Sequence, residues 1–125
     1  MLTSQEAIDA YAAACNTADP ETRRRLLEQA LTPDALVVYP NTEAHGWDGI
    51  LAAIDTLQQQ VPGVRVVLTS GIEAHHGWMR VAWRLCAADG AAIAGGEDVA
   101  EVAGDGRLHR IIGFHDPLPP PRGPR

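Results

Sequence analysis

The sequence contains no lysine, only two cysteines and no long apolar run. Its ten basic residues are therefore all arginine, and 16 acidic residues bring the net charge to −6. An acidic chain whose longest basic run is Arg23-Arg24-Arg25 is a poor binder of nucleic acid. Cys15 and Cys86 have neither a metal-site spacing nor the density of a disulfide framework, so each is expected to be a buried free thiol.

No stretch approaches the ~20 apolar residues that a bilayer span requires, and the N-terminus does not resemble a signal peptide. We therefore expect a soluble, cytoplasmic protein without membrane contacts. A chain of 125 residues predicts one domain, which we place at residues 1–116. The remaining residues, 117–125 (PLPPPRGPR), predict a disordered proline-rich tail.

Three helices are predicted in the first half of the chain. Thr3 and Glu6 have the spacing of a capping box at the start of the first helix. Asp19-Pro20-Glu21 marks the start of the second, because an acceptor precedes proline at the first helical position. Thr32-Pro33-Asp34 is expected to end that helix. The apolar spacing of Trp47–Gln60 predicts the third.

Strands are predicted mainly in the second half. Ala35–Tyr39 is expected to be a short strand, followed by a polar loop at Asn41–Gly46. Alternating apolar residues predict long strands at Val64–His75 and Trp78–Ala87, and Gly104-Asp105-Gly106 predicts the turn of a final hairpin. Helices on one side of an antiparallel sheet make an α+β fold. A curved sheet wrapped over three helices would leave a cone with a small-molecule pocket at its mouth.

Asp98 is an acid within a half-apolar strand of that hairpin, and His115 lies on the second strand. If Asp98 faces a dry interior, the pKa of its carboxyl rises, and the group can hold or donate a proton near neutral pH. Alternatively, Asp98 hydrogen-bonds the backbone at a bulge. Tyr11 lies on the apolar stripe of the first helix, so its hydroxyl needs an interior partner, for which a backbone carbonyl would suffice.

The other histidines give weaker signals. His75 and His76 lie at a predicted strand end and turn, where we expect them to be exposed. No cysteine or acid cluster accompanies them at ligand spacing, so we propose no metal site. His45, in the predicted polar loop, could instead overhang the mouth of the pocket.

Several short motifs follow one another in a distinctive order from about Ser4 to Asp116. They are Tyr11–Asn16 with Asp19, Gly46, Pro62-Gly63, His75–Gly77 with Trp83, Gly96–Asp98, Asp105–Arg107 and Gly113-Phe114. This joint order resembles the nuclear transport factor 2-like superfamily, in particular its SnoaL-like branch. The resemblance implies a cystatin-like, cone-shaped α+β fold and a homodimer formed through the outer sheet face.

The same superfamily includes ketosteroid isomerase, which uses a tyrosine and a protonated Asp to stabilise an oxyanion and a second Asp as base. Tyr11 matches that tyrosine and Asp98 the protonated acid. The base should precede Pro40, but this chain has Tyr39 there. A phenol with a reference pKa near ~10 is a poor base at neutral pH, which argues against steroid isomerisation by the usual route. His115 matches an inward-facing position, so proton chemistry remains open.

Two other enzyme types can be compared. SnoaL-like polyketide cyclases have an acid/base Asp that Asp98 matches, which implies an intramolecular aldol closure. Limonene-type epoxide hydrolases share a Tyr-x-Asn element with Tyr39-Pro40-Asn41. They also need an Arg and an Asp where this chain has Gly96 and Gly113, so we reject that activity.

The resulting prediction is an apolar pocket for a small, largely apolar organic ligand, without cofactor or metal. The reaction would be isomerisation, cyclisation or dehydration by acid–base chemistry on an enolisable carbonyl, with Asp98, Tyr11 and His115 as catalytic residues. The substrate-binding residues would be Tyr39, Trp47, Ile54, Leu57 and Trp83. The alternative is a non-catalytic ligand-binding or dimerisation module, in which Asp98 and Tyr11 bond to each other as a buried structural pair. The missing base at Tyr39 favours this alternative.

Overall fold

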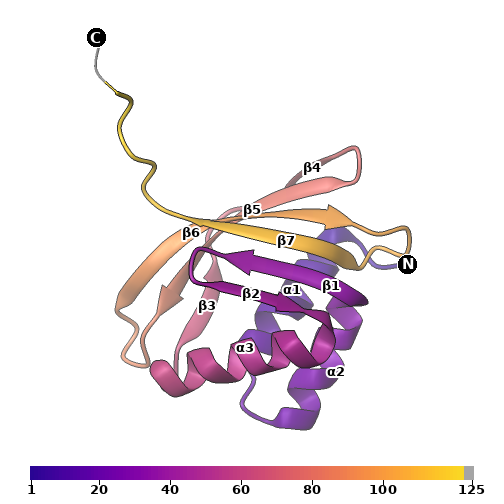
Figure 1. Ribbon diagram of the computed structural model, residues 1–125, viewed down its shortest axis with the longest axis horizontal. Helices are drawn as coiled ribbons and strands as arrows, with labels where there is room; N and C mark the ends of the chain where they lie inside the picture. The colour runs from indigo at the N-terminus through magenta and orange to yellow at the C-terminus, as the bar shows by residue number, and fades with distance from the viewer. Residues whose placement is uncertain (123–125) are drawn as a thin grey trace.

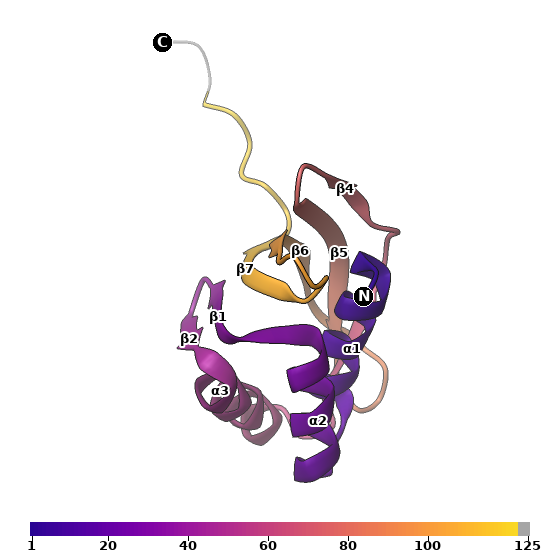
Figure 2. The same ribbon diagram turned by 90° about the vertical axis from the view of Figure 1, so that its right-hand side faces the viewer.

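Three helices lie on one side of a single curved sheet, as a computed structural model describing residues 1–122 shows (Figure 1). The side view shows the strands arching over the helices (Figure 2). The elements are α1 (Ser4–Asn16), α2 (Pro20–Ala30), β1 (Leu31–Tyr39), β2 (Thr42–His45), α3 (Gly46–Gln60), β3 (Arg65–Leu68), β4 (Glu73–His75), β5 (Trp78–Cys86), β6 (Ala92–Val102) and β7 (Leu108–His115). The predicted α+β class is confirmed.

The predicted helix starts are confirmed by their caps. The Thr3 hydroxyl accepts a hydrogen bond from the Glu6 N–H at 3.1 Å, and the Glu6 carboxylate accepts one from the Thr3 N–H at 3.0 Å. Asp19 accepts a hydrogen bond from the N–H of Thr22 at 2.9 Å, with Pro20 in the first turn. These contacts satisfy N–H groups that have no partner within the helix.

The sheet is mixed, not wholly antiparallel as predicted. Its strand order is β2-β1-β7-β6-β5-β3, with β4 also paired to β5. The exception to antiparallel pairing is β1 beside β7, which is parallel, with Val37 opposite Ile111. Local alternation gives the face of each residue but not the direction of a partner more than seventy residues away, so the sequence could not show this pairing.

Three boundaries in the sequence prediction were wrong. The expected loop at 41–46 contains β2, which forms a hairpin with β1. The expected strand at 64–75 is two strands, interrupted where the Ser70 hydroxyl accepts the N–H of Ala82 at 2.8 Å. Thr32-Pro33-Asp34 lies within β1, at an irregularity in its pairing with β7. Proline has no N–H to donate to a regular ladder, and it is tolerated here because the pairing is irregular at this point.

The core fills the space between the helices and the concave sheet face. Its largest fully buried side chains are Ile8, Leu27, Leu31, Ile50, Met79, Leu108, Ile111 and Val81. None of the helices within residues 1–122 is long and apolar enough to cross a membrane. Residues 116–122 are exposed and lie outside every helix and strand. The last three residues of the predicted tail fall outside the described residues.

Candidate active site

A cavity of about 550 Å³ lies within the cone, where α1 and α3 face the curved sheet. Its buried lining consists of Ile8, Tyr11, Cys15, Val37, Ile50, Ile54, Trp83 and Asp98. Its exposed lining consists of Asn41, Glu43, Thr56, Gln60 and His115. Tyr39 and Leu57 also line it, at intermediate exposure. The cavity therefore has a largely apolar interior, a polar rim and one buried carboxyl.

Asp98 points into this cavity from β6. It lies opposite Val81 of β5 and Gly113 of β7, and its side chain is only 4% exposed. Its carboxyl bonds two side chains instead of the backbone of a bulge: the Trp83 indole donates to Oδ1 at 2.9 Å and the Tyr39 hydroxyl to Oδ2 at 3.1 Å. Burial raises the pKa of Asp98 from 3.8 to about 6, and these two hydrogen bonds oppose the rise.

Tyr11 reaches the carboxyl only through a second tyrosine. Its hydroxyl lies 3.0 Å from that of Tyr39, which in turn bonds Asp98. The direct Asp98–Tyr11 pair of the non-catalytic alternative is therefore not what forms. Burial raises the pKa of both phenols well above the ordinary value, so both hydroxyls keep their protons near neutral pH. Burial likewise raises the pKa of the neighbouring Cys15 thiol to about 12.

His115 occupies the rim of the same cavity. Its exposed imidazole meets the Trp83 ring edge-on, with ring centroids 5.9 Å apart. His115 lies opposite Gly96, one inward-facing position along the sheet from the pair of Asp98 and Gly113. The structure therefore brings all three predicted catalytic residues to one cavity, two inside it and one at its rim.

Two glycines make room for the partners of Asp98. A Cβ on Gly113 would overlap the Tyr39 ring and lie 2.8 Å from Asp98 Oδ1. A Cβ on Gly96 would overlap the Phe114 carbonyl and lie 2.6 Å from the Trp83 ring. At the positions where an epoxide hydrolase would carry an acid and an arginine, this chain packs the two aromatic rings that hold its carboxyl.

Gly113→Ala should therefore lower the free energy of unfolding by about 1–3 kcal/mol, because the Tyr39 ring must move. Gly71→Ala is the matched control, since a Cβ there meets nothing within 4 Å. Chemical denaturation of both variants measures the difference, and equal losses would contradict the close packing of Tyr39 on Gly113.

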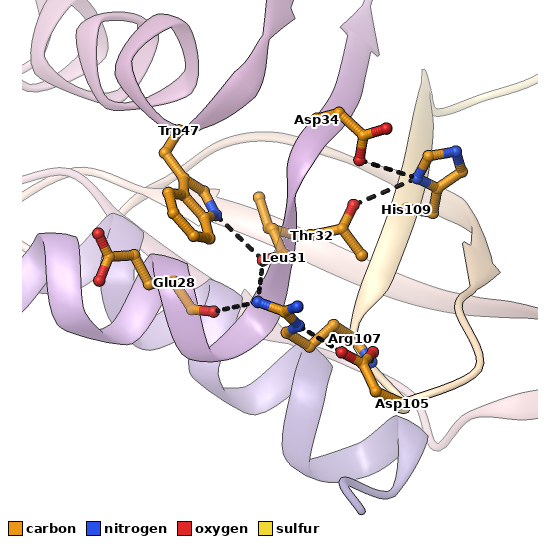
Figure 3. A network of polar contacts seen from close by, with 8 residues as sticks. All are labelled: Glu28, Leu31, Thr32, Asp34, Trp47, Asp105, Arg107 and His109. Carbon is orange, nitrogen blue, oxygen red and sulfur yellow. Dashed lines mark hydrogen bonds and ion pairs between the residues drawn. The ribbon is translucent and has the colours of Figure 1, made fainter.

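Trp47 is the predicted pocket residue that does not line the cavity. Its indole donates to the Leu31 carbonyl at 3.0 Å, joining the start of α3 to the start of β1 (Figure 3). The Arg107 guanidinium reaches the same carbonyl at 3.5 Å, the Glu28 carbonyl at 3.3 Å and the Asp105 carboxylate at 2.8 Å. Trp47 belongs to this structural network, which ties the β6–β7 turn to α2 and α3.

The remaining histidines do not line the cavity. His45 is exposed and contacts the carboxylate of the rim residue Glu43 at 3.0 Å. His75 and His76 are exposed, as expected. Within residues 1–122, no group of three or more His, Cys, Asp or Glu side chains could hold a metal ion.

Sequence reasoning missed most of the rim and both direct partners of Asp98. Asn41 and Glu43 reach the cavity because β2 folds back beside β1, and the alternation within Thr42–His45 was the available signal. Tyr39 and Trp83 were predicted as lining residues, but their hydrogen bonds to Asp98 depend on side chains from three different strands.

Comparison with known proteins places the chain in a family. No protein-family model matches it, and no curated protein is significantly similar. A solved structure of a candidate isomerase of the SnoaL-like family from Agrobacterium tumefaciens is 36% identical, with a TM-score of 0.85 over 94% of this chain and 100% of that one. The chain belongs to the SnoaL-like family.

More distant solved structures share the fold of this SnoaL-like protein. An NTF2-like protein of unknown function from Exiguobacterium is 18% identical, with a TM-score of 0.72 over 90% of this chain and 99% of that one. A candidate polyketide cyclase from Sinorhizobium meliloti is 14% identical, with a TM-score of 0.70 over 90% of this chain and 100% of that one. The 36% identical relative confirms the predicted superfamily and branch.

Proposed function

We propose that this SnoaL-like protein binds a small, largely apolar carbonyl compound in its cone and catalyses proton transfer at the carbon beside the carbonyl. The observation that carries the proposal is the buried Asp98 carboxyl in the lining of a largely apolar cavity, with its pKa raised to about 6. A proton carrier with a pKa near the working pH is suited to general acid–base catalysis. The similarity to a candidate isomerase is consistent with this chemistry.

Three side chains divide the proposed reaction. Tyr11 donates a hydrogen bond to the substrate oxygen as the carbonyl becomes an enol or enolate, and Asp98 supports this donor through Tyr39. The C–H electrons form the new C=C bond, and the carbonyl π electrons move to oxygen. His115 at the rim and the buried Asp98 are the two groups able to carry the proton. Its return to a different carbon gives an isomer, whereas attack of the enol carbon on a second carbonyl closes a ring.

A second candidate function is ligand binding without turnover. Tyr39, at the position of the usual base, already bonds Asp98 Oδ2, and Trp83 bonds Oδ1. In the part of the chain that the structure describes, every buried side-chain nitrogen or oxygen has a hydrogen-bond partner. A fully paired polar group of this kind can be purely structural.

Exchange of α-hydrogens distinguishes the two functions without knowledge of the natural substrate. Incubation of α-tetralone with the protein in deuterated buffer, followed by proton NMR, measures loss of the hydrogens beside the carbonyl. The catalytic proposal expects exchange faster than in buffer with free histidine at equal concentration. Binding of the ketone, detected by calorimetry, with exchange at the buffer rate would favour the second function.

We also infer that a second copy of the chain covers the outer sheet face, as the family resemblance implies. That face exposes Phe114 (57%) and Ile112 (39%), which are apolar side chains on neighbouring positions of β7. Phe114→Glu should convert a dimer into a monomer in sedimentation velocity, while Leu118→Glu, beyond the sheet, should leave it intact. A wild-type protein that sediments as a monomer would contradict the inference.

A further inference from the structure

Two phenols and a carboxyl that line the cavity form a line of hydrogen bonds. Asp98 Oδ2 lies 3.1 Å from the Tyr39 hydroxyl, which lies 3.0 Å from the Tyr11 hydroxyl. Each phenol carries one proton, whereas the carboxyl carries one or none. The number of protons in the line therefore decides which way its hydrogen bonds point.

When Asp98 is ionised, the protons of the line point towards the carboxylate. Tyr39 donates to Oδ2, so the hydrogen bond between the phenols must use the proton of Tyr11. The Tyr11 oxygen then offers only a lone pair to the cavity. In this state the site accepts a hydrogen bond from a ligand hydroxyl.

When Asp98 is protonated, the line reverses. The Trp83 indole N–H can only donate, so Oδ1 stays an acceptor and the acid proton lies on Oδ2. That proton is donated to Tyr39, whose own proton is donated to Tyr11. Tyr11 is then free to donate its proton to a ligand in the cavity that it lines.

We propose that the Tyr11–Tyr39–Asp98 line is a reversible proton relay that selects the ligand, which is a neutral carbonyl compound when Asp98 holds a proton and a hydroxyl donor when it does not. This inference rests on the proposed function of the same cavity and names its substrate class. Tyr39, at the position of the usual base, is thereby a positioning residue that connects Tyr11 to its proton source.

The relay also accounts for proton delivery to the substrate oxygen. Tyr11 gives its proton to that oxygen, Tyr39 gives one to Tyr11, and Asp98 gives one to Tyr39. The net change is one proton moved from the carboxyl to the substrate, leaving a carboxylate and two intact phenols. No other reactant is required, and His115 at the rim remains available for the proton on carbon.

Few other groups facing Asp98 can change charge in the same pH range. From α1, Tyr11 and Cys15 face it, and from β1, Tyr39; burial raises the pKa of all three, which keeps them uncharged. β5 contributes the indole of Trp83, which does not titrate. The titratable rim residues are Glu43 on β2 and His115 on β7, and α3 lines the cavity without a charged side chain. His115→Gln is therefore the control for rim titration.

Two probes with the same bicyclic frame test the ligand selection by calorimetry. α-Tetralone can only accept a hydrogen bond, whereas the tetrahydronaphthol with its hydroxyl on the aromatic ring can donate one. With the pKa of Asp98 at about 6, ketone affinity should fall roughly tenfold from about pH 5 to about pH 7, and phenol affinity should rise roughly tenfold. Asp98→Asn should bind the ketone tightly at every pH, because its amide donates to Tyr39 as the protonated acid does. Tyr39→Phe should remove both pH dependences.

A titration of the apo protein tests the relay without any ligand. The chain has only two tyrosines, so carbon NMR with labelled tyrosine resolves both. Both should respond at the midpoint of Asp98, and in Tyr39→Phe the response of Tyr11 should be lost. Probe affinities that do not change with pH would overturn the relay and leave the proposed function standing. A pH dependence of probe affinity that persists in Tyr39→Phe would do the same. If the signals of both tyrosines respond at the midpoint of Asp98 but the protein binds neither probe, the proposed function and its ligand class would be overturned. The line of hydrogen bonds itself would stand.

Discussion

Asp98→Asn should slow protein-catalysed α-hydrogen exchange in α-tetralone by about 10²-fold or more. The substituted amide can still accept from Trp83 and donate to Tyr39, so the local packing and both hydrogen bonds of the site are retained. It cannot release or take up a proton near neutral pH. The loss should therefore appear in the exchange rate while the ketone still binds.

Glu97→Gln is the matched control for this substitution. Glu97 is the neighbouring acid on the same strand, but its side chain is 41% exposed and contacts Arg80 at 3.4 Å. Glu97 points to the outer face, so the Glu97→Gln protein should catalyse exchange at the rate of the wild type. Tyr11→Phe should lower the rate by about 10²-fold as well, because it removes the donor to the substrate oxygen. Unchanged rates in both Asp98→Asn and Tyr11→Phe would show that the catalytic assignment is wrong.

The free energy of unfolding of the wild type, relative to Asp98→Asn, should fall by about 3 kcal/mol as the pH rises from below 3.8 to above about 6. A folded-state pKa above the unfolded value means that the folded protein binds this proton more tightly. Between the two pKa values the folded state holds more protons than the unfolded state, so stability decreases as pH increases. The stabilising contribution is complete below 3.8 and is lost through about pH 6.

Denaturant unfolding of both proteins across this range measures the effect, and the difference between them cancels the other titrating groups. Asp98→Asn should be the more stable protein at neutral pH, because its amide requires no buried charge. A variant that is less stable than the wild type at neutral pH, with no dependence on pH, would instead indicate that the ionised carboxylate is a favourable structural partner.

The sequence predicted the parts of the fold that depend on neighbouring residues. Caps at Thr3 and Asp19 set the first two helix starts, whereas the sequence left the direction of Asp98 open between the interior and a bulge. The parallel pairing of β1 with β7 depends on contacts between distant segments, which no local pattern encodes. Trp47 shows the same limit: its apolar character was correctly recognised, but its indole turned to the Leu31 carbonyl.

The composition of the site was predicted better than its connections. Tyr11, Tyr39, Trp83 and Asp98 were all placed in one pocket, and all four line the cavity. Their order, with Tyr39 between Tyr11 and Asp98, arises because Gly113 lets the Tyr39 ring lie against its backbone. A contact made possible by a missing side chain on another strand leaves no signal in local periodicity.

The most direct test of this account is the pKa of the Asp98 carboxyl in the apo protein, measured by carbon-detected NMR titration. We predict a midpoint of about 6, because burial in the apolar cavity outweighs the two hydrogen bonds that stabilise the charged form. A midpoint at or below the ordinary 3.8 would mean a solvated or charge-stabilised acid. That result would contradict both the proton-carrying role of Asp98 and the relay through Tyr39.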